Sequence, residues 1–350
     1  MAIADWLLYG ANGYTGELIA NEAIARGMRP ILAGRRAEVI KPLAEKLGLP
    51  HRIFPLNSPE EIAAQLETVA AILLAAGPFS ATSALVVEAC LQARAHYLDI
   101  TGEISVFEHC AKQHQRAVQA GSVILPGVGF DVVPSDCLAA NLAQKLPDAT
   151  HLELAFAGGS ISKGTARTML EGLGLGGAIR ENGRIRRVPI AWRTAQVGFR
   201  DKVRNAVSIP WGDVSTAYRS TGISNIVVYA AAPRKQVAFM RTLRYIAPVL
   251  KSKSVRRLLA HQIDRRITGP SPERRAAART QLWGKVSNSA GLEVEGTLET
   301  PEAYRLTATA AVECMRRVLQ GGVAPGVQTP STAFGSSFIT ELPGCDLRIG

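Results

Sequence analysis

Cysteine is scarce in this sequence and is never paired. Five cysteines are scattered over 350 residues without a Cys-x-x-Cys pair, at Cys90, Cys110, Cys137, Cys314 and Cys345. An odd number of scattered cysteines predicts neither a disulfide framework nor a cysteine-based zinc site. Since this usage is typical of a reducing compartment, we expect a cytoplasmic protein.

Long apolar runs are missing as well. The sequence contains no stretch of about 18 apolar residues, and no basic segment and apolar core precede a cleavage site near residue 1. We therefore expect neither a membrane span nor export. With 47% hydrophobic and 20% charged residues, the composition is that of a globular protein large enough for two domains.

Glycine, by contrast, is regularly placed near the N-terminus. The stretch WLLYGANGYTGELIANEAIARG contains Gly10, Gly13 and Gly16, with a strand-like apolar run before them and a helical pattern after them. In a dinucleotide-binding turn the first glycine permits the tight exit from the strand. The second lets the backbone approach a pyrophosphate, and the third lets the helix pack on the sheet. The sequence predicts such a turn, although a plain glycine-rich turn is the alternative.

An acidic residue is missing where an NAD site would have one. That residue usually lies about 20 positions past the glycines, at the end of the second strand, and binds the ribose hydroxyls. Here the predicted strand PILAGRR ends with Arg35 and Arg36. A guanidinium binds a phosphate bidentately. We therefore expect the cofactor NADP (NADPH), with both arginines at its 2′-phosphate, unless they are only solvated loop residues.

Strand-like and helix-like segments alternate through the first part of the chain, as a doubly wound parallel sheet requires. The further predicted strands are HRIFPL, VAAILLAAGPF, HYLDITGE and SVILPGVGFDVVP, with one helix between the last two running through Cys110 and Ala117. The predicted fold class is α/β, with a Rossmann domain at 1–136. A mixed α+β domain with an antiparallel sheet would occupy 137–305, followed by a final segment, 306–350.

Ligands of such sheets bind beyond the carboxyl ends of the strands. The residues expected to face that crevice are Asn57, Gly77, Pro78, Thr101, Gly102, Glu103, Gly129 and Asp131. Of these, Asn57, Gly77 and Pro78 are expected to contact the cofactor. His96 and Tyr97 begin the fifth predicted strand, far from its carboxyl end, and we expect them to be structural.

Charge divides the sequence into two halves. Residues 1–140 carry 10 basic and 14 acidic side chains, whereas residues 141–350 carry 30 and 15. Residues 234–279 alone hold 13 Lys or Arg against Asp264 and Glu273. Such a segment attracts acidic lipid, an acidic carrier protein or a nucleotide-tailed substrate, or it is a solvated helical face. Phe239 and Tyr245 are its only aromatic residues, so we expect no nucleic-acid partner.

Residues 234–266 have the pattern of an amphipathic helix. Apolar side chains at Val237, Met240, Leu243, Ile246 and Leu250 would form one stripe, followed by Lys251, Lys253, Arg256 and Arg257. Pro248 would kink this helix. The stripe is too short to span a bilayer but fits an anionic membrane interface. Two expectations stay open here: the stripe packs on the protein itself, or it makes peripheral contact with an anionic membrane.

Seven motifs in order resemble the saccharopine dehydrogenase-like oxidoreductases, particularly the branch that includes trans-acting enoyl reductases. They are GANGYTGELIA, AGR, AAGPF, HYLDITGE, GVGFDVVPSD, GPSPERRAAART and QTPSTAFGSSFITELPG. The resemblance implies an NADP-binding Rossmann domain, an inserted α+β domain and a final segment, 306–350, that returns to the first domain. It also implies that the pyrophosphate is cradled by Gly10, Asn12, Gly13, Tyr14, Thr15 and Gly16, and that Arg35 and Arg36 hold the 2′-phosphate.

Two common catalytic motifs of dehydrogenases are absent. None of the seven tyrosines has a lysine four residues later, which excludes the proton donor of the short-chain dehydrogenases. No His-Glu-x-x-His arrangement occurs, and we expect no metal. Hydride transfer needs little beyond orientation of the nicotinamide. The catalytic residue stays unknown, with Asp99, Glu103 and Asp131 as weak candidates for an acid at the strand ends.

Three functions fit these patterns. An NADP-dependent reductase of an unsaturated or carbonyl-bearing acyl substrate, free or linked to CoA or a carrier, is favoured. An imine-reducing enzyme of the amino-acid type would need arginines for substrate carboxylates, and Arg167 or Arg193 could serve. A non-catalytic NADP sensor or scaffold is the third. Whether the chain forms a homodimer is not encoded in any of these patterns.

Overall fold

The computed structural model describes residues 5–158, 176–250 and 269–350. It also describes the isolated positions 162, 164, 166, 167, 170, 255, 259, 261, 262 and 265. The chain forms two compact units. Unit 1 comprises Met1–Val133 and Tyr304–Gly335, and unit 2 comprises Pro134–Ala303 and Ser336–Gly350. Residues of the predicted C-terminal segment thus occur in both units.

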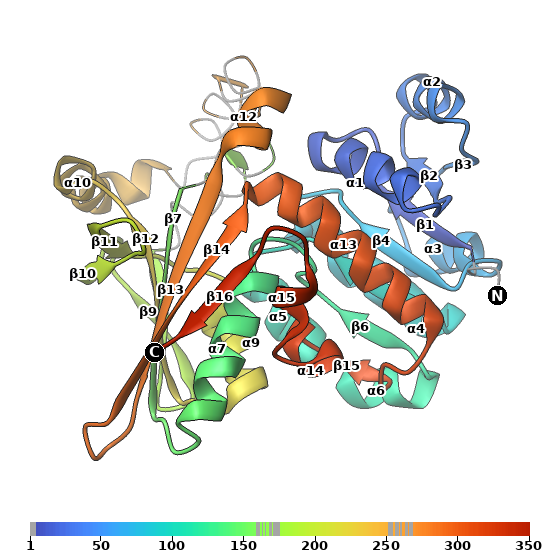
Figure 1. The fold of residues 1–350 in the computed structure, drawn as a ribbon. Coiled ribbons are helices and arrows are strands. Elements are labelled where there is room, and N and C mark those ends of the chain that lie inside the picture. The colour runs from blue at the N-terminus through green and yellow to red at the C-terminus, as the bar shows by residue number, and fades with distance from the viewer. Residues whose placement is uncertain are drawn as a thin grey trace. The chain divides into compact units, whose positions relative to one another are not determined.

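Unit 1 is built on a parallel sheet of seven strands, seen in Figure 1. Their order is β15 (Gly326–Val327), β6 (Val123–Leu125), β5 (His96–Asp99), β4 (Ala71–Leu74), β1 (Trp6–Tyr9), β2 (Ile31–Gly34) and β3 (His51–Ile53). The helices are α1 (Tyr14–Ala25), α2 (Ala37–Leu47), α3 (Pro59–Leu66), α4 (Phe79–Ala93), α5 (Ile104–Ala111), α6 (His114–Ala120), α13 (Ala303–Gln320) and α14 (Pro330–Phe334). The α/β Rossmann prediction is confirmed.

Burial explains why these strands lie in the middle of unit 1. Every residue of β1, β2 and β4 is buried, as expected of strands covered on both faces. Leu7, Ile72 and Tyr97 belong to one core with apolar residues of α3, α4, α5 and α6. Helices α1 and α13 lie on the face of the sheet that is turned toward the viewer in Figure 1.

Several predicted strands were too long. The fourth pairs only over Ala71–Leu74, and the sixth pairs only over Val123–Leu125. Residues 126–130 are buried but irregular, because Gly127, at a φ of 78°, turns the chain out of the sheet. An apolar sequence pattern indicates burial rather than strand pairing. A buried loop therefore has the same pattern as a buried strand. The helix predicted through Cys110 and Ala117 is two helices, α5 and α6.

Unit 2 contains a second, mixed sheet of nine strands. Its main path is β10 (Thr194–Gly198), β11 (Val203–Ser208), β12 (Asn225–Ala231), β7 (His151–Ala157), β13 (Arg279–Ser287), β14 (Glu293–Pro301) and β16 (Asp346–Ile349). Strand β8 (Gly177–Glu181) pairs with β12 and with β9 (Arg184–Val188). The described helices are α7 (Val133–Lys145), α9 (Asp213–Thr221), α10 (Arg234–Leu250), α12 (Pro272–Ala277) and α15 (Phe338–Glu341).

The expectation of an antiparallel sheet in the second domain is wrong at one pair. Strands β7 and β12 run parallel, whereas β7 and β13 run antiparallel. A parallel pair needs a long crossover, and here β8 to β11 and α9 separate β7 from β12 along the chain. One face of the sheet carries a core that includes Tyr229 and Trp283. On the other face, side chains of α7 reach Gly284.

Some sequence expectations fall outside the described residues. Lys251, Lys253, Arg256 and Arg257 lie there, and so do the side chains of Leu243, Ile246, Pro248 and Leu250. Val237 and Met240 of the predicted stripe are described, and they pack against other apolar residues of unit 2. Among the described residues, no helix has the length and apolar composition needed to cross a membrane.

An ionic cluster around Glu313 joins the last segment of unit 1 to α1. The carboxylate of Glu313 forms ion pairs with three arginines. They are Arg26, directly after α1, at 3.1 Å, Arg316 at 2.6 Å and Arg317 at 2.8 Å. Burial opposes ionisation of Glu313, but the hydrogen bonds and charges of Arg316 and Arg317 outweigh it. The pKa is lowered to about 2. Glu313 is thus ionised in the folded protein at almost any accessible pH.

We expect Glu313→Gln to destabilise unit 1 at neutral pH by about 1–3 kcal/mol, because three arginines lose a charged acceptor. A carboxylate whose pKa is lower when folded stabilises the protein above its ordinary pKa. That contribution is lost as pH falls toward the folded pKa, so the difference between variant and wild type should shrink between about pH 4.5 and 2. Urea titrations across this range measure it.

Glu88→Gln is the matched control, because Glu88 pairs with Arg116 at 2.8 Å on a more exposed surface. This variant should lose less than about 1 kcal/mol. Equal losses in both variants would contradict the special role of Glu313.

Candidate functional site

The turn between β1 and α1 is a compact backbone structure. Gly10, at a φ of 84°, donates its N–H to the carbonyl of Ala33 at 2.9 Å, and its own carbonyl accepts from Gly13 N–H at 3.0 Å. A Cβ on Gly10 would lie 2.8 Å from the carbonyl carbon of Ala75. The first glycine is therefore required both by its φ and by the neighbouring end of β4.

The other two glycines differ in what surrounds them. A Cβ on Gly16 would lie 2.3 Å from the Gly10 carbonyl oxygen, so only glycine lets α1 pack this closely on the turn. A Cβ on Gly13 would meet one atom within 4 Å, the Gly10 oxygen at 3.3 Å, and Gly13 has an ordinary φ of −78°. The space in front of Gly13 is therefore open.

Helix α1 begins without a side-chain cap. Its N-cap is Gly13, whereas Ser58 caps α3 and Thr329 caps α14. The first amides of an α-helix have no acceptor within the helix, so an uncapped N-terminus is suited to an anion. Tyr14 and Thr15 are the first two residues of α1, and the Tyr14 ring packs edge-on against Tyr304, with centroids 5.1 Å apart.

The end of β2 supplies cations and no carboxylate. Arg35 and Arg36 are exposed at its carboxyl end, and Arg36 lies 4.0 Å from Glu38 of α2. Arg35 makes no hydrogen bond or ion pair with any residue that the structure describes. Burial raises the pKa of Tyr9 to about 12, and the nearby charge of Arg35 opposes this. Arg35 is thus an uncompensated cation beside the turn.

Asn12, Asn57, Gly77 and Pro78 are spread along the same edge. The side-chain oxygen Oδ1 of Asn12 would lie 3.5 Å from a Cβ on Gly34, which places this side chain at the end of β2. Gly77 and Pro78 follow β4, the neighbour of β1. Asn57 follows the outermost strand β3 and is exposed, so β2 separates it from the glycine turn.

Glu103 has a structural role that the sequence does not reveal. Its two carboxylate oxygens accept the N–H groups of Phe79 at 2.9 Å and Ser80 at 2.8 Å, at the start of α4. The N-terminus of α4 is thereby closed by a side chain 24 residues away, a separation at which no local capping pattern is visible. The helix end beside β4 is therefore occupied, while the one beside β1 is not capped by a side chain.

Asp99 is also engaged within the protein. It is completely buried and accepts hydrogen bonds from the Tyr97 hydroxyl at 2.5 Å, Thr101 N–H at 3.0 Å and Gly127 N–H at 2.8 Å. Burial raises its pKa to about 6, and these three hydrogen bonds oppose the rise. Through its hydrogen bond from Gly127 N–H, Asp99 holds the loop after β6 against the end of β5. Tyr97 is structural, as predicted.

His96 is structural too, as its Nδ1 accepts from Val123 N–H at 3.0 Å and burial lowers its pKa.

Asp131 differs from the other two carboxylates in its surroundings. It is only partly buried, in the loop after β6, and its Oδ2 would lie 2.6 Å from a Cβ on Gly102. The loop is held by a hydrogen bond from Phe130 N–H to the Thr307 hydroxyl at 3.0 Å. Burial raises the pKa of Asp131 to about 7. Of the three candidates, Asp131 combines access to solvent with a pKa suited to proton transfer near neutrality.

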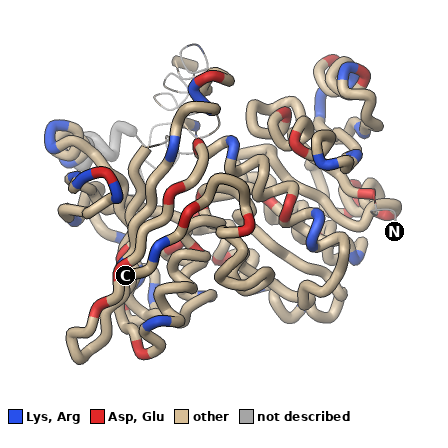
Figure 2. Tube along the Cα trace, in the orientation of Figure 1, with Lys and Arg blue, Asp and Glu red and all other residues tan. Residues whose placement is uncertain are grey.

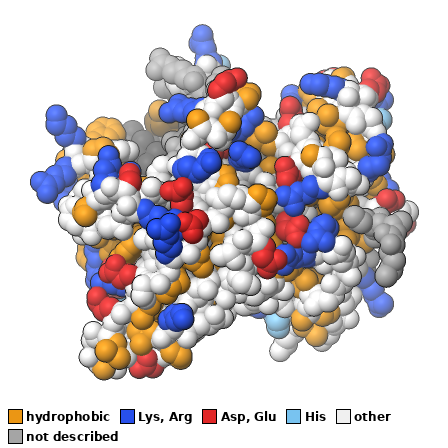
Figure 3. Space-filling view, viewed as in Figure 1, with side chains coloured by type: hydrophobic (Ala, Val, Ile, Leu, Met, Phe, Trp, Pro, Cys, Tyr) orange, Lys and Arg blue, Asp and Glu red, His pale blue; other side chains and the backbone are white. Residues whose placement is uncertain are grey.

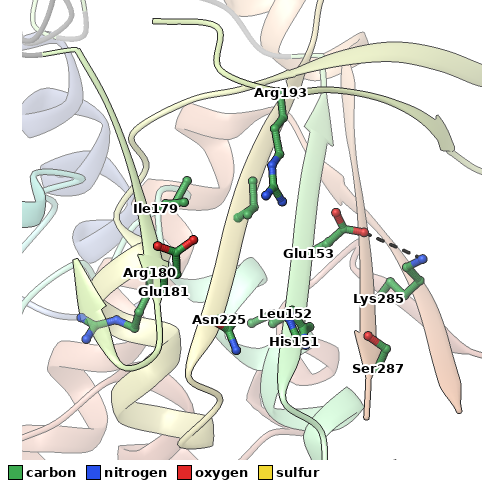
Figure 4. A pocket seen from close by; sticks show the side chains of 11 residues that line it. His151, Leu152, Glu153, Ile179, Arg180, Glu181, Arg193, Asn225, Lys285 and Ser287 are labelled. Carbon is green, nitrogen blue, oxygen red and sulfur yellow. Dashed lines mark ion pairs between the residues drawn. The ribbon is translucent and has the colours of Figure 1, made fainter. Parts of the chain in front are cut away.

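Unit 2 has a cavity of its own, of about 260 Å³, on one face of its sheet (Figure 4). Its polar lining includes Glu153, which accepts from the Tyr229 hydroxyl at 3.0 Å and lies 3.8 Å from Lys285. Arg193 points over this cavity from the segment before β10. Arg167 is exposed and is not among the lining residues.

No protein-family model matches the chain. The chain is 24% identical to a trans-acting enoyl reductase of Mycobacterium tuberculosis (strain H37Rv), in an alignment that covers 99% of this chain and 97% of that protein. It is 33% identical to a predicted trans-acting enoyl reductase of the same strain over 184 residues. That match covers 48% of this chain and 43% of the relative, so it spans less than half of the relative's length.

Among solved structures, the fold is similar to apo saccharopine dehydrogenase (L-Glu forming) from Saccharomyces cerevisiae. The TM-score is 0.66, and the match covers 99% of this chain and 100% of the other. Sequence identity between the two is 11%, so this likeness concerns the fold.

Gly13 and Gly16 allow the turn to be tested. We expect Gly13→Ala to fold and to lose most of its affinity for NADPH, because the methyl group enters the open space where a pyrophosphate would approach. Gly16→Ala should instead lose roughly 1–3 kcal/mol or more of folding free energy, since its methyl group meets the Gly10 carbonyl. Calorimetric NADPH titration and thermal unfolding of both variants separate the two effects. Unchanged NADPH affinity in a folded Gly13→Ala protein would contradict this assignment.

Proposed function

We propose that this chain, a saccharopine dehydrogenase-like oxidoreductase of the trans-acting enoyl reductase branch, uses NADPH to reduce an unsaturated or carbonyl-bearing acyl substrate. The observation that carries the cofactor assignment is the uncapped α1 N-terminus behind Gly13, next to Arg35 and Arg36. The similarity to a trans-acting enoyl reductase extends over 97% of that protein's length and supports an enoyl group as the group that is reduced. The acyl group would be free or linked to CoA or a carrier.

The residues present fit a dinucleotide at the carboxyl edge of the unit 1 sheet. The open space before Gly13 admits a phosphate that a Cβ there would displace. The amides at the start of α1 would bind the pyrophosphate. Arg35, which has no partner among the described residues, would bind the 2′-phosphate, and Arg36 would assist. No acidic side chain lies between β2 and Glu38 to bind ribose hydroxyls in their place.

NADPH, when bound, would supply the hydride. Reduction of an enoyl substrate would then also require a proton at its α-carbon. Asp131 would donate that proton, because its raised pKa of about 7 keeps a large protonated fraction near neutral pH. Solvent would reprotonate it, since Asp131 is only partly buried. Asp99 and Glu103 would keep their neighbouring loops and α4 in place.

A screen of NADPH oxidation tests the function. Enoyl thioesters, ketones, and pairs of an amine with a 2-keto acid are offered separately, and we expect oxidation with an enoyl thioester or a ketone. Oxidation only with the amine pairs would contradict the proposal and favour an imine-reducing enzyme. Tight NADPH binding without oxidation of any substrate would instead indicate a sensor or scaffold.

Asp131→Asn tests the proton donor. With the substrate that the screen identifies, kcat/KM of the wild type should fall as pH rises through about 7, because the acid form is consumed. The variant should be about 10²–10⁴-fold slower and lack this inflection. Steady-state rates from acidic to alkaline pH measure both.

The stability of Asp131→Asn provides the control. A carboxyl group whose pKa is raised by folding stabilises the protein below its ordinary pKa, and that stability is lost as pH rises through about 7. The variant should therefore be at least as stable as wild type at neutral pH. A slow variant that is also unfolded, or an unchanged pH profile, would count against Asp131 as the acid.

A further inference from the structure

Unit 2 carries a surface on which exposed aromatic rings are surrounded by cations. We call it the aromatic–basic surface and define it by Arg186, Trp192, Arg234, Lys235, Phe239 and Tyr245. Helix α10 and the segment before β10 meet there, because Val237 of α10 packs in one apolar cluster with Ala191. The Arg241 side chain also donates to the Ala191 carbonyl at 3.4 Å.

The three rings are unusually exposed for their size. Tyr245 is 80% exposed, Phe239 63% and Trp192 41%, whereas Trp6 and Trp283 are buried. The Arg186 guanidinium lies over the Trp192 ring, 6.0 Å from its centroid. Large apolar side chains that gather on a surface instead of in a core mark an interaction site.

The outward half of α10 presents both of its exposed rings. At about 100° per residue, Phe239 and Tyr245 lie roughly 120° apart around the helix axis. Lys235 and Thr242 fall between them, and all four are exposed. Val237 and Met240 lie on the opposite side, against the rest of unit 2. Val237 and Met240 of the apolar stripe thus pack on unit 2, whereas the rings of Phe239 and Tyr245 on the other face of α10 are exposed.

The charge of this surface has one sign. Residues 184–193 and 234–245 contain eight Arg or Lys and no Asp or Glu. Figure 2 shows Lys and Arg on α10, and Figure 3 shows basic side chains beside hydrophobic ones over the same helix. Glu181 is the neighbouring acid, and it pairs with Arg186 at 3.0 Å. Charge of one sign repels a second copy of the same face, which argues against a symmetric contact through it.

We propose that the aromatic–basic surface docks on an anionic lipid surface. Aromatic rings partition to the headgroup level of a bilayer, and each nearby Lys or Arg is attracted by anionic headgroups. A helix that lies in the interface shows this combination of exposed rings and cations. An acidic protein would satisfy the cations, but the three exposed rings favour a membrane interface. The proposal is independent of the substrate of unit 1.

Sedimentation with vesicles tests the docking. The full chain is mixed with vesicles of phosphatidylcholine alone, or of phosphatidylcholine with phosphatidylserine, at low and at higher salt. We expect binding to the anionic vesicles only, and weaker binding as salt rises. Arg234→Gln with Lys235→Gln should weaken binding roughly 25-fold, at about 5-fold for each cation. Phe239→Ala with Tyr245→Ala should weaken it at least about 10-fold.

Two control variants remove an exposed apolar side chain and an exposed cation outside the aromatic–basic surface. Leu292 is 60% exposed, in the turn between β13 and β14, and Lys112 is an exposed cation at the end of α5. Leu292→Ala and Lys112→Gln should bind anionic vesicles like wild type. All variants should unfold at the same temperature as wild type, which shows that they are folded.

Trp192 provides a second readout. Brominated lipids should quench the tryptophan fluorescence of the vesicle-bound protein, and most of the quenching should be lost in Trp192→Phe, because Trp6 and Trp283 are buried and Trp211 is only partly exposed. No binding to anionic vesicles at low salt would overturn the proposal. So would binding to poly-glutamate without binding to vesicles, which would identify an acidic polypeptide as the partner. Equal binding of the surface and control variants would overturn it too.

Discussion

The direct contact between α1 and the backbone of the β1–α1 turn is the constraint on which the candidate site depends. Gly16 allows this contact, since a Cβ would lie 2.3 Å from the Gly10 carbonyl oxygen. The start of α1 is thereby held at the carboxyl edge of the parallel sheet. Strands β2, β4 and β6 end at the same edge and bring Arg35, Gly77 and Asp131 to it. The site is built from strand ends that parallel pairing holds together, and α1 begins at the same edge.

Helices α1 and α4 both begin at this edge, and their N-termini differ in how they are capped. The start of α4 is closed by the carboxylate of Glu103, whereas the start of α1 has Gly13 and no side-chain cap. A carboxylate supplied from within the chain competes with any external anion at α4. An external phosphate would meet no such competition at α1, where the space before Gly13 is open.

The sequence was sufficient for the fold class and for the resemblance to a family. Glycine spacing and buried apolar runs are local signals, and they predicted the Rossmann sheet correctly. Strand lengths were overestimated, because the buried residues after Leu125 have the same apolar pattern as a strand. The parallel pairing of β7 with β12 was missed, since pairing partners are set by chain crossovers rather than by local pattern.

The candidate acids could not be ranked from the sequence. Asp99, Glu103 and Asp131 all follow strand ends, and their differences arise from partners distant in the chain. Glu103 meets the start of α4, and Asp99 meets Gly127. The assignment of Asp131 as the proton donor therefore rests on burial and surroundings, which only three-dimensional structure provides.

The central claim is that the edge around Gly13 and Arg35 binds NADPH through its 2′-phosphate. Calorimetric affinities of wild type and Arg35→Ala for NADPH and NADH test it most directly, with Lys41→Ala, an exposed cation on α2, as control. We predict that Arg35→Ala loses about 10–150-fold in NADPH affinity, the value of one charge-assisted contact, while NADH affinity stays unchanged. Equal weakening for both cofactors, or no change for NADPH, would contradict the claim.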